Sequence, residues 1–481
     1  MRIGQTSVIY FFGKIAASVV GFLATVYFAR LLGAEVLGFY AVATAVAGWL
    51  KLGGSMGIGS AVQKRMSEDD ETEQHFIAGL LMVAAFATVS VTLLLLFGDQ
   101  VNAYIGADAA LLLAALVVAQ LLFAIVGAGL KGQRRVHVYG LLKPLKQVSQ
   151  SVTQLVLIVP ALFGLGLAGL LAGKTVGGLL VTVVAIGVLG VRVRRPAIRH
   201  FKSLFSYAKY SWLGSVESRT FKQADILIMG FFVSSALIGV YSIAWSLVMF
   251  LTLFGGSIRT TLFPEISNAS ASANKDPVPL IEDGVAYQGL ILIPGLVGGT
   301  LLSDRILQIY GEEFVQGAAV LWILIFAVLL KGYQSQFLTA LNGIDRPDIS
   351  FRIYSVFIIS NLMLNVVLIS LYGWVGAAVA TALSAGIGLS IAYASVTRLT
   401  SFVTPKIMIG KQIVSALAMG IFVYFGSFVD LPGVLGQNVI TVLLLVGFGA
   451  AVYFLVLMAI STQFRETIRR NLPEGIETRV G

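Results

Sequence analysis

Long apolar runs, each of about 20 residues, recur along the whole chain and are separated by short polar segments. A helix of that length crosses the hydrocarbon core of a bilayer. Lipid excludes open sheet edges, so the runs are predicted as helices. The pattern predicts fourteen spans, near 6–30, 35–61, 76–97, 108–130, 139–163, 167–190, 205–231, 235–261, 285–303, 316–338, 350–371, 374–397, 409–429 and 436–460.

The composition agrees with an all-α polytopic membrane protein. Of 481 residues, 57% are hydrophobic and 12% charged, whereas soluble domains carry about 25% charged residues. The absence of cysteine excludes disulfides, thiol catalysis and thiolate metal sites. His75, His137 and His200 fall in predicted loops far apart in sequence, so no metal site is expected.

Charge predicts the orientation. With the N-terminus in the cytoplasm, most of the 33 Lys and Arg residues fall in cytoplasmic segments or at their helix ends. The protein is therefore predicted to lie in the cytoplasmic membrane with both termini in the cytoplasm. This topology, rather than a nucleic-acid partner, explains the net charge of +10. The basic segment 192–204 is predicted to be a solvated linker that touches anionic lipid headgroups. The acidic run 68–73 is expected to be solvated.

The chain resembles itself at two offsets. At 201 residues, 37–40 aligns with 238–241, and at 211 residues, 130–135 aligns with 341–346. Six helices separate the copies, so the halves should be parallel repeats with the substrate site between them. The predicted parts are an N-lobe at 1–191, a linker at 192–204, a C-lobe at 205–398, two further helices at 399–461 and a cytoplasmic tail at 462–481.

Two glycine motifs resemble nucleotide sites without their context. Gly164-x-Gly166-x-x-Gly169 joins two apolar spans, and Gly173-Lys174-Thr175 lies within one. A dinucleotide or phosphate loop needs a strand before it. No other grouping suggests catalysis, so no enzyme activity and no cofactor are expected. Transport would then run on an H⁺ or Na⁺ gradient, on membrane potential, or downhill.

Five cations fall inside spans, where each costs roughly 2.5–3.5 kcal/mol unless it faces water or a partner. They are Lys14, Lys51, Lys174, Arg219 and Lys222, and the acids at that depth are Glu217 and Asp225. The excess of positive charge predicts a cavity for an anion with several negative charges, such as a pyrophosphate. The acids are candidates for coupling. The alternatives are snorkelling of the lysines to an interface and, on 205–231, pairing of the cations with the two acids.

The predicted span 139–163 carries a polar stripe at helical spacing. Its members are Lys143, Lys146, Gln150 and Gln154. The stripe is a candidate entry path for the anion from the cytoplasm. The alternative is interfacial anchoring together with hydrogen bonds between helices.

Several runs resemble a known family. Those at 224–230 (ADILIMG), 238–244 (IGVYSIA) and 262–265 (LFPE) are similar to the helix 7–8 signature of polysaccharide-biosynthesis flippases. Those at 28–33 (FARLLG) and 38–40 (GFY) resemble the helix 1–2 hairpin of the same proteins. These are oligosaccharidyl-lipid members of the multidrug/oligosaccharidyl-lipid/polysaccharide exporter superfamily.

The resemblance implies two six-helix lobes forming a V around a central cavity, with alternating access. Cationic residues on helices 1, 2 and 7 of such flippases hold the lipid-linked phosphate, and Lys14, Lys51, Arg219 and Lys222 lie in those helices here. In some relatives helices 13 and 14 line a groove for the lipid tail.

Three functions follow as hypotheses. The first is a flippase for a polyprenyl-(pyro)phosphate-linked oligosaccharide, serving surface polysaccharide or glycoprotein assembly. Its partners would be membrane lipids and the glycosyltransferases, polymerase or ligase of the same pathway. The second is a cation-coupled multidrug and toxin exporter, disfavoured because the first six spans hold no acid at mid-span. The third is a scaffold that does not transport, which would have no use for unpaired charges in the membrane.

Overall fold

The computed structural model describes residues 3–55, 57–68, 71–208, 213–272, 275–428 and 437–471. Within these ranges all regular secondary structure is helical, as the apolar pattern predicts. By packing, the chain divides into two compact units, Met1–Ser242 and Ile243–Gly481.

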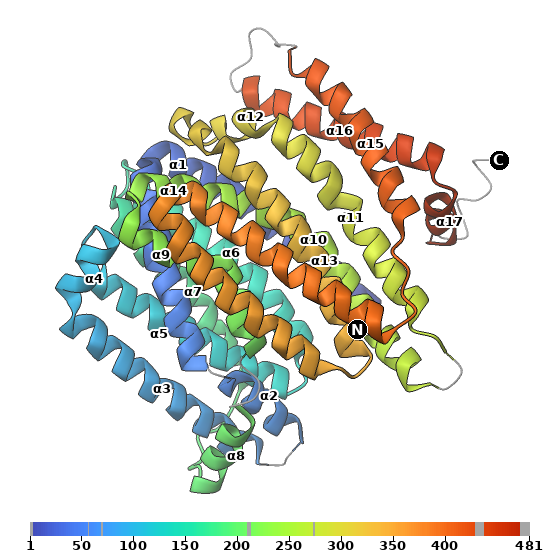
Figure 1. Ribbon diagram of the computed structural model, residues 1–481. Coiled ribbons are helices and arrows are strands. Elements are labelled where there is room, and N and C mark those ends of the chain that lie inside the picture. Colours follow the sequence, from blue (N-terminus) through green and yellow to red (C-terminus); the bar gives the residue numbers. More distant parts are fainter. Residues whose placement is uncertain are drawn as a thin grey trace. The chain divides into compact units, whose positions relative to one another are not determined.

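Unit 1 holds the first helices of the chain (Figure 1). Their bounds are α1 (Ile3–Ser55), α2 (Ile58–Glu68), α3 (Thr72–Leu96), α4 (Gly98–Ile105), α5 (Ala110–Gly132), α6 (Val136–Ile158), α7 (Gly166–Leu189), α8 (Ile198–Ala208) and α9 (Leu213–Phe232), with the first turns of α10 (Ser235–Ala271).

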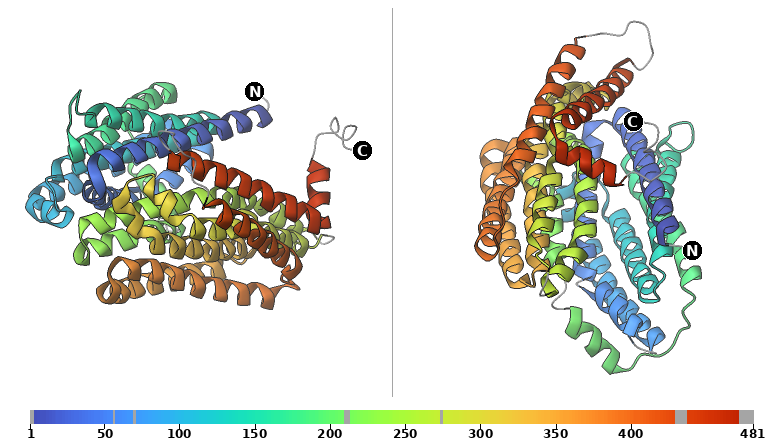
Figure 2. Two further views of the ribbon diagram at one scale, coloured as in Figure 1. Left: turned by 90° about the horizontal axis from the view of Figure 1, so that it is seen from above. Right: turned by 90° about the vertical axis from the view of Figure 1, so that its right-hand side faces the viewer.

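Unit 2 begins inside α10. It continues with α11 (Val278–Leu301), α12 (Ser303–Gln308), the 3₁₀ helix η1 (Glu312–Gly317), α13 (Ala318–Gly343), α14 (Pro347–Leu399), α15 (Lys406–Gly426), α16 (Gln437–Ile460) and α17 (Thr462–Asn471). The views in Figure 2 show α15 and α16 side by side.

Two long helices each contain a sharp bend at a glycine. In α1 the bend is at Gly33 (φ 77°, ψ 173°), and in α14 it is at Gly373 (φ 60°, ψ −141°). Glycine adopts positive φ without the penalty that a β-carbon brings. Each bent helix therefore consists of two limbs, and each limb corresponds to one predicted span.

Most described residues of the fourteen predicted spans lie in helices, but the number of membrane crossings stays a prediction. In the described residues, ten helices are long and apolar enough to cross a bilayer, including the two bent ones. The helices α6 and α9 are not among the ten, and both carry charged side chains that the sequence singles out.

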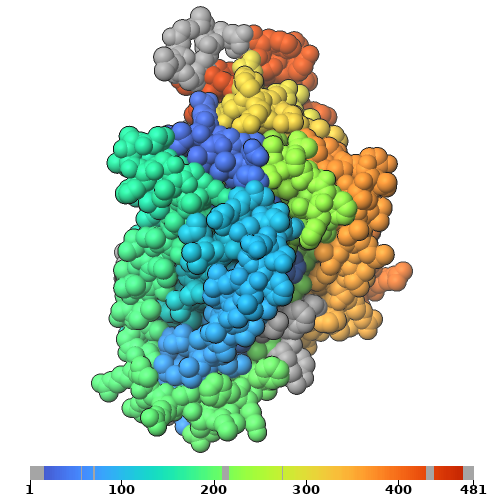
Figure 3. Space-filling view, turned by 90° about the vertical axis from the view of Figure 1, so that its left-hand side faces the viewer, coloured from blue at the N-terminus to red at the C-terminus, as the bar shows by residue number. Residues whose placement is uncertain are grey.

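The outer surface of the helices is apolar, as it is in a protein that lies in lipid. Leu96 of α3 is 72% exposed, Val183 of α7 is 67% exposed and Phe425 of α15 is 67% exposed. Figure 3 shows one such face, on which α3 lies at the surface. Water-soluble monomers rarely expose apolar residues at this density. The chain is thus a multi-pass membrane protein.

One turn occurs in both halves with the same unusual backbone. Arg134 (φ 62°) and Asp345 (φ 58°) are the described non-glycine residues with positive φ, and they lie 211 positions apart. In each turn the N–H of the following arginine donates to a leucine carbonyl, at 2.9 Å for Arg135 and 2.8 Å for Arg346. The two turns therefore share one backbone conformation at the predicted offset.

The predicted lobes and the packed units have different limits. The helix α9 belongs to the predicted C-lobe, yet it packs against α1 and α4 within unit 1. A repeat is defined by sequence and a unit by contacts, so the lobe bounds stay a prediction.

The basic linker and the acidic run bind each other, which corrects the expectation that both are merely solvated. Glu71 forms an ion pair with Arg199, and its Oε2 lies 2.9 Å from Nε2 of His200. Arg194 pairs with Glu73 at 2.7 Å. The hydrogen bond from His200, assisted by the charge of Arg199, lowers the pKa of Glu71 below its usual value. The ion pairs hold α8 and the linker against the start of α3, and α8 also packs against α2.

The histidines also differ from their expected placement. His75 and His200 lie in helices rather than loops, both are buried, and their ring centroids are 4.8 Å apart in an edge-on contact. His137, at the start of α6, is exposed. Separation in sequence was therefore a poor guide to separation in space, because α8 folds back onto α3.

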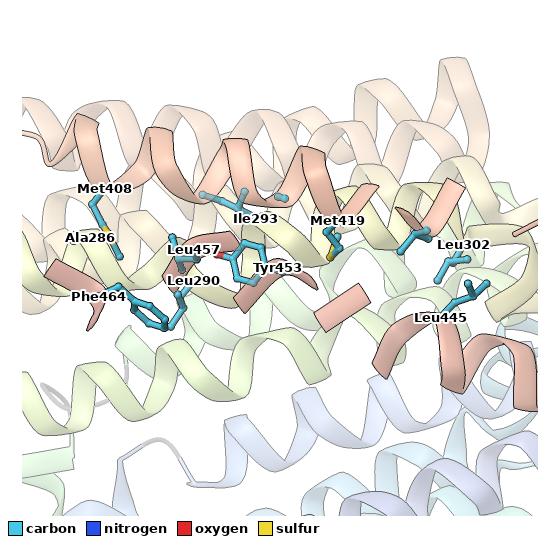
Figure 4. Packing of buried hydrophobic residues seen from close by; sticks show 12 residues of the cluster. Ala286, Leu290, Ile293, Leu302, Met408, Met419, Leu445, Tyr453, Leu457 and Phe464 are labelled. Atoms are coloured by element: carbon cyan, nitrogen blue, oxygen red, sulfur yellow. The ribbon is translucent and has the colours of Figure 1, made fainter. Parts of the chain in front are cut away.

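The core of unit 2 joins α15 and α16 to α11. Met419 and Tyr453 pack with Leu290 and Ile293 in one cluster of buried side chains (Figure 4). A neighbouring apolar cavity of about 290 Å³ is lined by residues of α10, α11, α13, α15 and α16.

Candidate functional site

Five cationic side chains of unit 1 gather on four helices. Lys51 lies on the second limb of α1 and Arg219 on α9. The others are Lys143 and Lys146 of α6 and Lys174 of α7. The charge of Lys51 is repelled by those of Arg219 and Lys143. The charge of Lys146 is repelled by those of Lys51 and Lys174. The cationic cluster, as these five residues are called below, is therefore continuous.

Among the described residues, the cationic cluster has no carboxylate partner, since none forms an ion pair with any of its five members. Lys51, Lys146, Lys174 and Arg219 are half-buried. Like charges held together out of water are a standing cost unless an anion or water offsets it. The arrangement is chemically suited to an anion, and a role of these cations in substrate binding stays a prediction.

The guanidinium of Arg219 points towards α1. Its Nη1 donates to Gln223 Oε1 at 2.6 Å, one turn further along α9. A β-carbon at Gly48 of α1 would lie 2.6 Å from both of these atoms. The glycine therefore lets the Arg219–Gln223 pair lie against the same limb of α1 that carries Lys51.

The polar stripe of α6 divides into two parts with different surroundings. Lys143 is exposed and Lys146 lies with its Nζ 4.0 Å from the ring centroid of Phe123. Gln150 donates to the carbonyl of Lys174 at 2.9 Å, and Gln154 donates to that of Leu170 at 2.8 Å. The two glutamines thus join α6 to α7. For them the structure agrees with the second interpretation of the stripe, hydrogen bonds between helices. The entry path stays a prediction for the two lysines.

Glycines on α7 make this joining possible. A β-carbon at Gly173 would lie 2.5 Å from Cα of Gln154, and one at Gly177 would lie 2.6 Å from the carbonyl oxygen of Ser149. Close approach through small residues is common between membrane helices, where hydrogen bonds then add to packing. Gln150 and Gln154 therefore fix the position of Lys174 relative to α6.

Tyr40 belongs to this site, although the sequence marks it only as part of a repeated motif. Lys174 Nζ donates to Tyr40 Oη at 2.9 Å and lies 4.8 Å from the centroid of its ring. Gln154 Nε2 donates to the same hydroxyl at 2.9 Å. The signal in the sequence was the tyrosine at the end of the GFY run, but only packing shows which helices it contacts.

The acids of α9 are placed differently from the cations. Asp225 is 1% exposed, accepts the hydroxyl of Tyr241 and accepts the N–H of Ile226 at 2.9 Å. Glu217 is 6% exposed. The carboxylate of Asp225 is thus engaged in joining α9 to α10. The role of both acids in coupling stays a prediction.

The sequence also predicts Lys222 and Lys14 as members of the binding site. Lys222 lies on α9 three residues after Arg219 and is exposed. Lys14 lies on the first limb of α1, and its side chain is outside the described residues.

The helices and the cationic cluster together define a multi-pass membrane protein with a candidate anion site. A solved structure of the lipid II flippase MurJ in an inward closed conformation matches with a TM-score of 0.81 and 18% identity, over 96% of this chain and 100% of that one. An inward-facing multidrug resistance transporter of the MOP superfamily matches with a TM-score of 0.67 and 14% identity, over 79% of this chain and 95% of that one.

The sequence comparisons narrow the class. Residues 27–319 match the family model described as polysaccharide biosynthesis protein. The chain is 30% identical over 481 residues to the probable flippase AglR of Haloferax volcanii, covering 99% of both. It is 28% identical to the probable low-salt glycan biosynthesis flippase Agl15 of the same organism, covering 98% of this chain and 99% of that one. The chain belongs to the polysaccharide biosynthesis protein family.

Proposed function

We propose that this protein is a flippase that moves a polyprenyl-(pyro)phosphate-linked oligosaccharide from the cytoplasmic to the outer leaflet of the cytoplasmic membrane. The observation that carries the proposal is the cationic cluster, whose members have no carboxylate partner among the described side chains. Multiply charged phosphates are the anions that such clusters bind best. The relatives that match over nearly their whole length, named as probable flippases, support the same function.

The remaining parts of the proposal follow from the same assignment. The lipid tail stays in the bilayer while the cationic cluster holds the phosphate. Both termini lie in the cytoplasm. The product serves surface polysaccharide or glycoprotein assembly, so the enzymes that build and transfer the glycan are its partners. Movement is driven by an H⁺ or Na⁺ gradient or by membrane potential.

Transport in proteoliposomes tests the proposal. The probe is a fluorescent polyprenyl-pyrophosphate glycan, and its arrival in the opposite leaflet is followed by quenching. We expect wild-type protein to move the probe, and Lys51→Ala and Arg219→Ala to lose about tenfold or more in rate, because each removes a charged contact. Lys406→Ala, at the exposed start of α15, is the matched control.

The outcomes separate the three hypotheses. Unchanged rates in both variants would place the phosphate elsewhere. No movement of any polyprenyl-linked glycan by folded wild-type protein would contradict the flippase. Cation-coupled efflux of organic cations would then favour the multidrug exporter, and an absence of any transport would favour the scaffold.

A further inference from the structure

The hydroxyl of Tyr40 lies where the second limb of α1 meets α6 and α7. It accepts hydrogen bonds from Lys174 Nζ and from Gln154 Nε2, each at 2.9 Å. A tyrosine hydroxyl has two lone pairs and one hydrogen. Both acceptor positions are therefore filled, and the O–H of Tyr40 remains to be donated.

The hydrogen-bonding groups around Tyr40 that remain unused are donors. The ammonium of Lys174 has three N–H bonds, and its hydrogen bond to Tyr40 uses one of them. In the described part of the chain, neither the O–H of Tyr40 nor the other two N–H bonds of Lys174 have an acceptor. Three donors and one positive charge thus have no acceptor among the described residues, and an oxyanion complements them.

The second half of the chain shows what such a tyrosine binds. Tyr241 is the counterpart of Tyr40 at the offset of 201 residues, and it donates its hydroxyl to the carboxylate of Asp225. At the same offset Asp225 corresponds to Ala24, which has no acceptor in its side chain. The second half therefore contains its own carboxylate, whereas the first half has the donors without the acceptor.

This donor group is set apart from the other cations. Tyr40 precedes Lys51 by eleven residues on the same limb of α1, which separates the two positions by about 16 Å along the helix axis. Lys146 lies within range of both Lys51 and Lys174. The cationic cluster thus has two ends. One end is at Lys51 and Arg219, the other is at Lys174 beside Tyr40, and Lys146 lies between them.

We propose that Lys174 and Tyr40 form a second anion subsite, distinct from that of Lys51 and Arg219, which binds a second negatively charged group of the same substrate. The inference rests on the proposed function, with a first phosphate held by Lys51 and Arg219. The second group is an oxyanion: the distal phosphate of a pyrophosphate linkage or the carboxylate of an acidic sugar. The substrate class is accordingly a lipid-linked glycan with two separated anionic groups.

Binding to purified full-length protein in detergent tests the subsite. The probes are three fluorescent polyprenyl lipids: a monophosphate with a neutral sugar, a pyrophosphate with the same sugar, and a monophosphate with a uronic acid. The variants are Tyr40→Phe, which removes the hydroxyl and keeps the ring, and Lys174→Met, which removes the charge and keeps the length. Lys406→Met is the matched control for loss of a lysine. Thermal unfolding verifies that each variant folds.

We expect both variants to raise the Kd of at least one doubly charged lipid about tenfold, as loss of a charged hydrogen bond does, while the monophosphate with a neutral sugar changes less than twofold. An effect confined to the pyrophosphate identifies the second phosphate as the occupant. An effect confined to the uronic acid identifies the sugar carboxylate.

Two outcomes would overturn the subsite. If the variants weaken all three lipids equally, Lys174 and Tyr40 belong to a single phosphate site. If they change none, the pair only joins helices. Wild-type binding of the three lipids, lost in Lys51→Ala, shows that the proposed function stands in either case, whereas wild-type protein that binds none of them contradicts the proposed function itself.

Discussion

The helices that carry Gly38 and Gly239 cross at these two glycines, in a reciprocal contact within unit 1. A β-carbon at Gly38 would overlap the carbonyl oxygen of Ser235, and one at Gly239 would overlap that of Ala34. Both pairs are related by the offset of 201 residues, since Ala34 corresponds to Ser235 and Gly38 to Gly239. Each helix thus brings the same small-x-x-x-small motif to the crossing, and the backbones meet directly.

Alanine at either glycine should therefore destabilise the protein. We expect Gly38→Ala and Gly239→Ala each to cost about 1–3 kcal/mol, because the overlapped atom is backbone and must move with its helix. Thermal unfolding in detergent, followed by tryptophan fluorescence, measures the change. The double variant should cost less than the sum, since the first substitution already separates the helices.

A glycine in open surroundings is the control for these substitutions. Gly187 of α7 has no atom within 4 Å of the place where its β-carbon would lie. Gly187→Ala should leave the midpoint unchanged or raise it, because alanine favours the helix. Equal losses at Gly38 and Gly187 would show that the crossing contributes nothing particular.

The cationic cluster should lower the stability of the ligand-free protein. Lys51 is repelled by Arg219 and Lys143 and has no ion pair with a carboxylate among the described residues. We expect Lys51→Met to raise the free energy of unfolding without ligand by about 0.5–2 kcal/mol while it weakens binding, a common trade between stability and function. Lys406→Met should change stability by about 0.5 kcal/mol or less. A destabilised Lys51→Met protein with unchanged binding would mean that Lys51 is structural.

The fold was predictable from the sequence to a large extent because lipid imposes one simple rule. Apolar runs in a bilayer form helices that satisfy their own backbone hydrogen bonds, and most described residues of the predicted spans do lie in helices. Charges inside those runs are costly, which is why Lys51, Lys174 and Arg219 are conspicuous in the sequence itself. The bends at Gly33 and Gly373 agree with the limits of the predicted spans.

The contacts between helices were not predictable in the same way. Glycines on α7 decide which face of α6 lies against it, and their effect is visible only once the helices are packed. The sequence alone therefore leaves Gln150 and Gln154 open to an entry path or to contacts between helices. The sequence marks Tyr40 through its place in a repeated motif but does not indicate what its side chain does. The docking of α8 was missed because Glu71 and His200 are 129 positions apart.

Asp225 should act on stability rather than on substrate affinity. Its carboxylate is 1% exposed and accepts the hydroxyl of Tyr241. Asp225→Ala leaves that buried hydroxyl without its acceptor, and such a loss costs about 1–3 kcal/mol. We expect a lower unfolding midpoint and a Kd for polyprenyl-phosphate lipids within twofold of wild type, measured below the unfolding range. A large loss of affinity in folded protein would instead place Asp225 in the binding site.

The attachment of the linker should depend on pH through Glu71. The hydrogen bond from His200, with the charge of Arg199, lowers the pKa of Glu71 in the folded protein. A group with a lowered folded pKa stabilises the fold above its unfolded pKa, about 4.3 for glutamate, and this contribution is lost as the pH falls through the folded value. Hydrogen exchange of the α8 amides should therefore show slow exchange at neutral pH and progressively weaker protection below about pH 4. Glu71→Gln should weaken protection at neutral pH and remove most of this acid dependence. Glu68→Gln, which alters an exposed ion pair within α2, should leave both unchanged. Protection that is equally strong at pH 3 and pH 7 in wild-type protein would mean that the buried face of α8, with Leu204 and Ala208, holds the linker without the ion pairs.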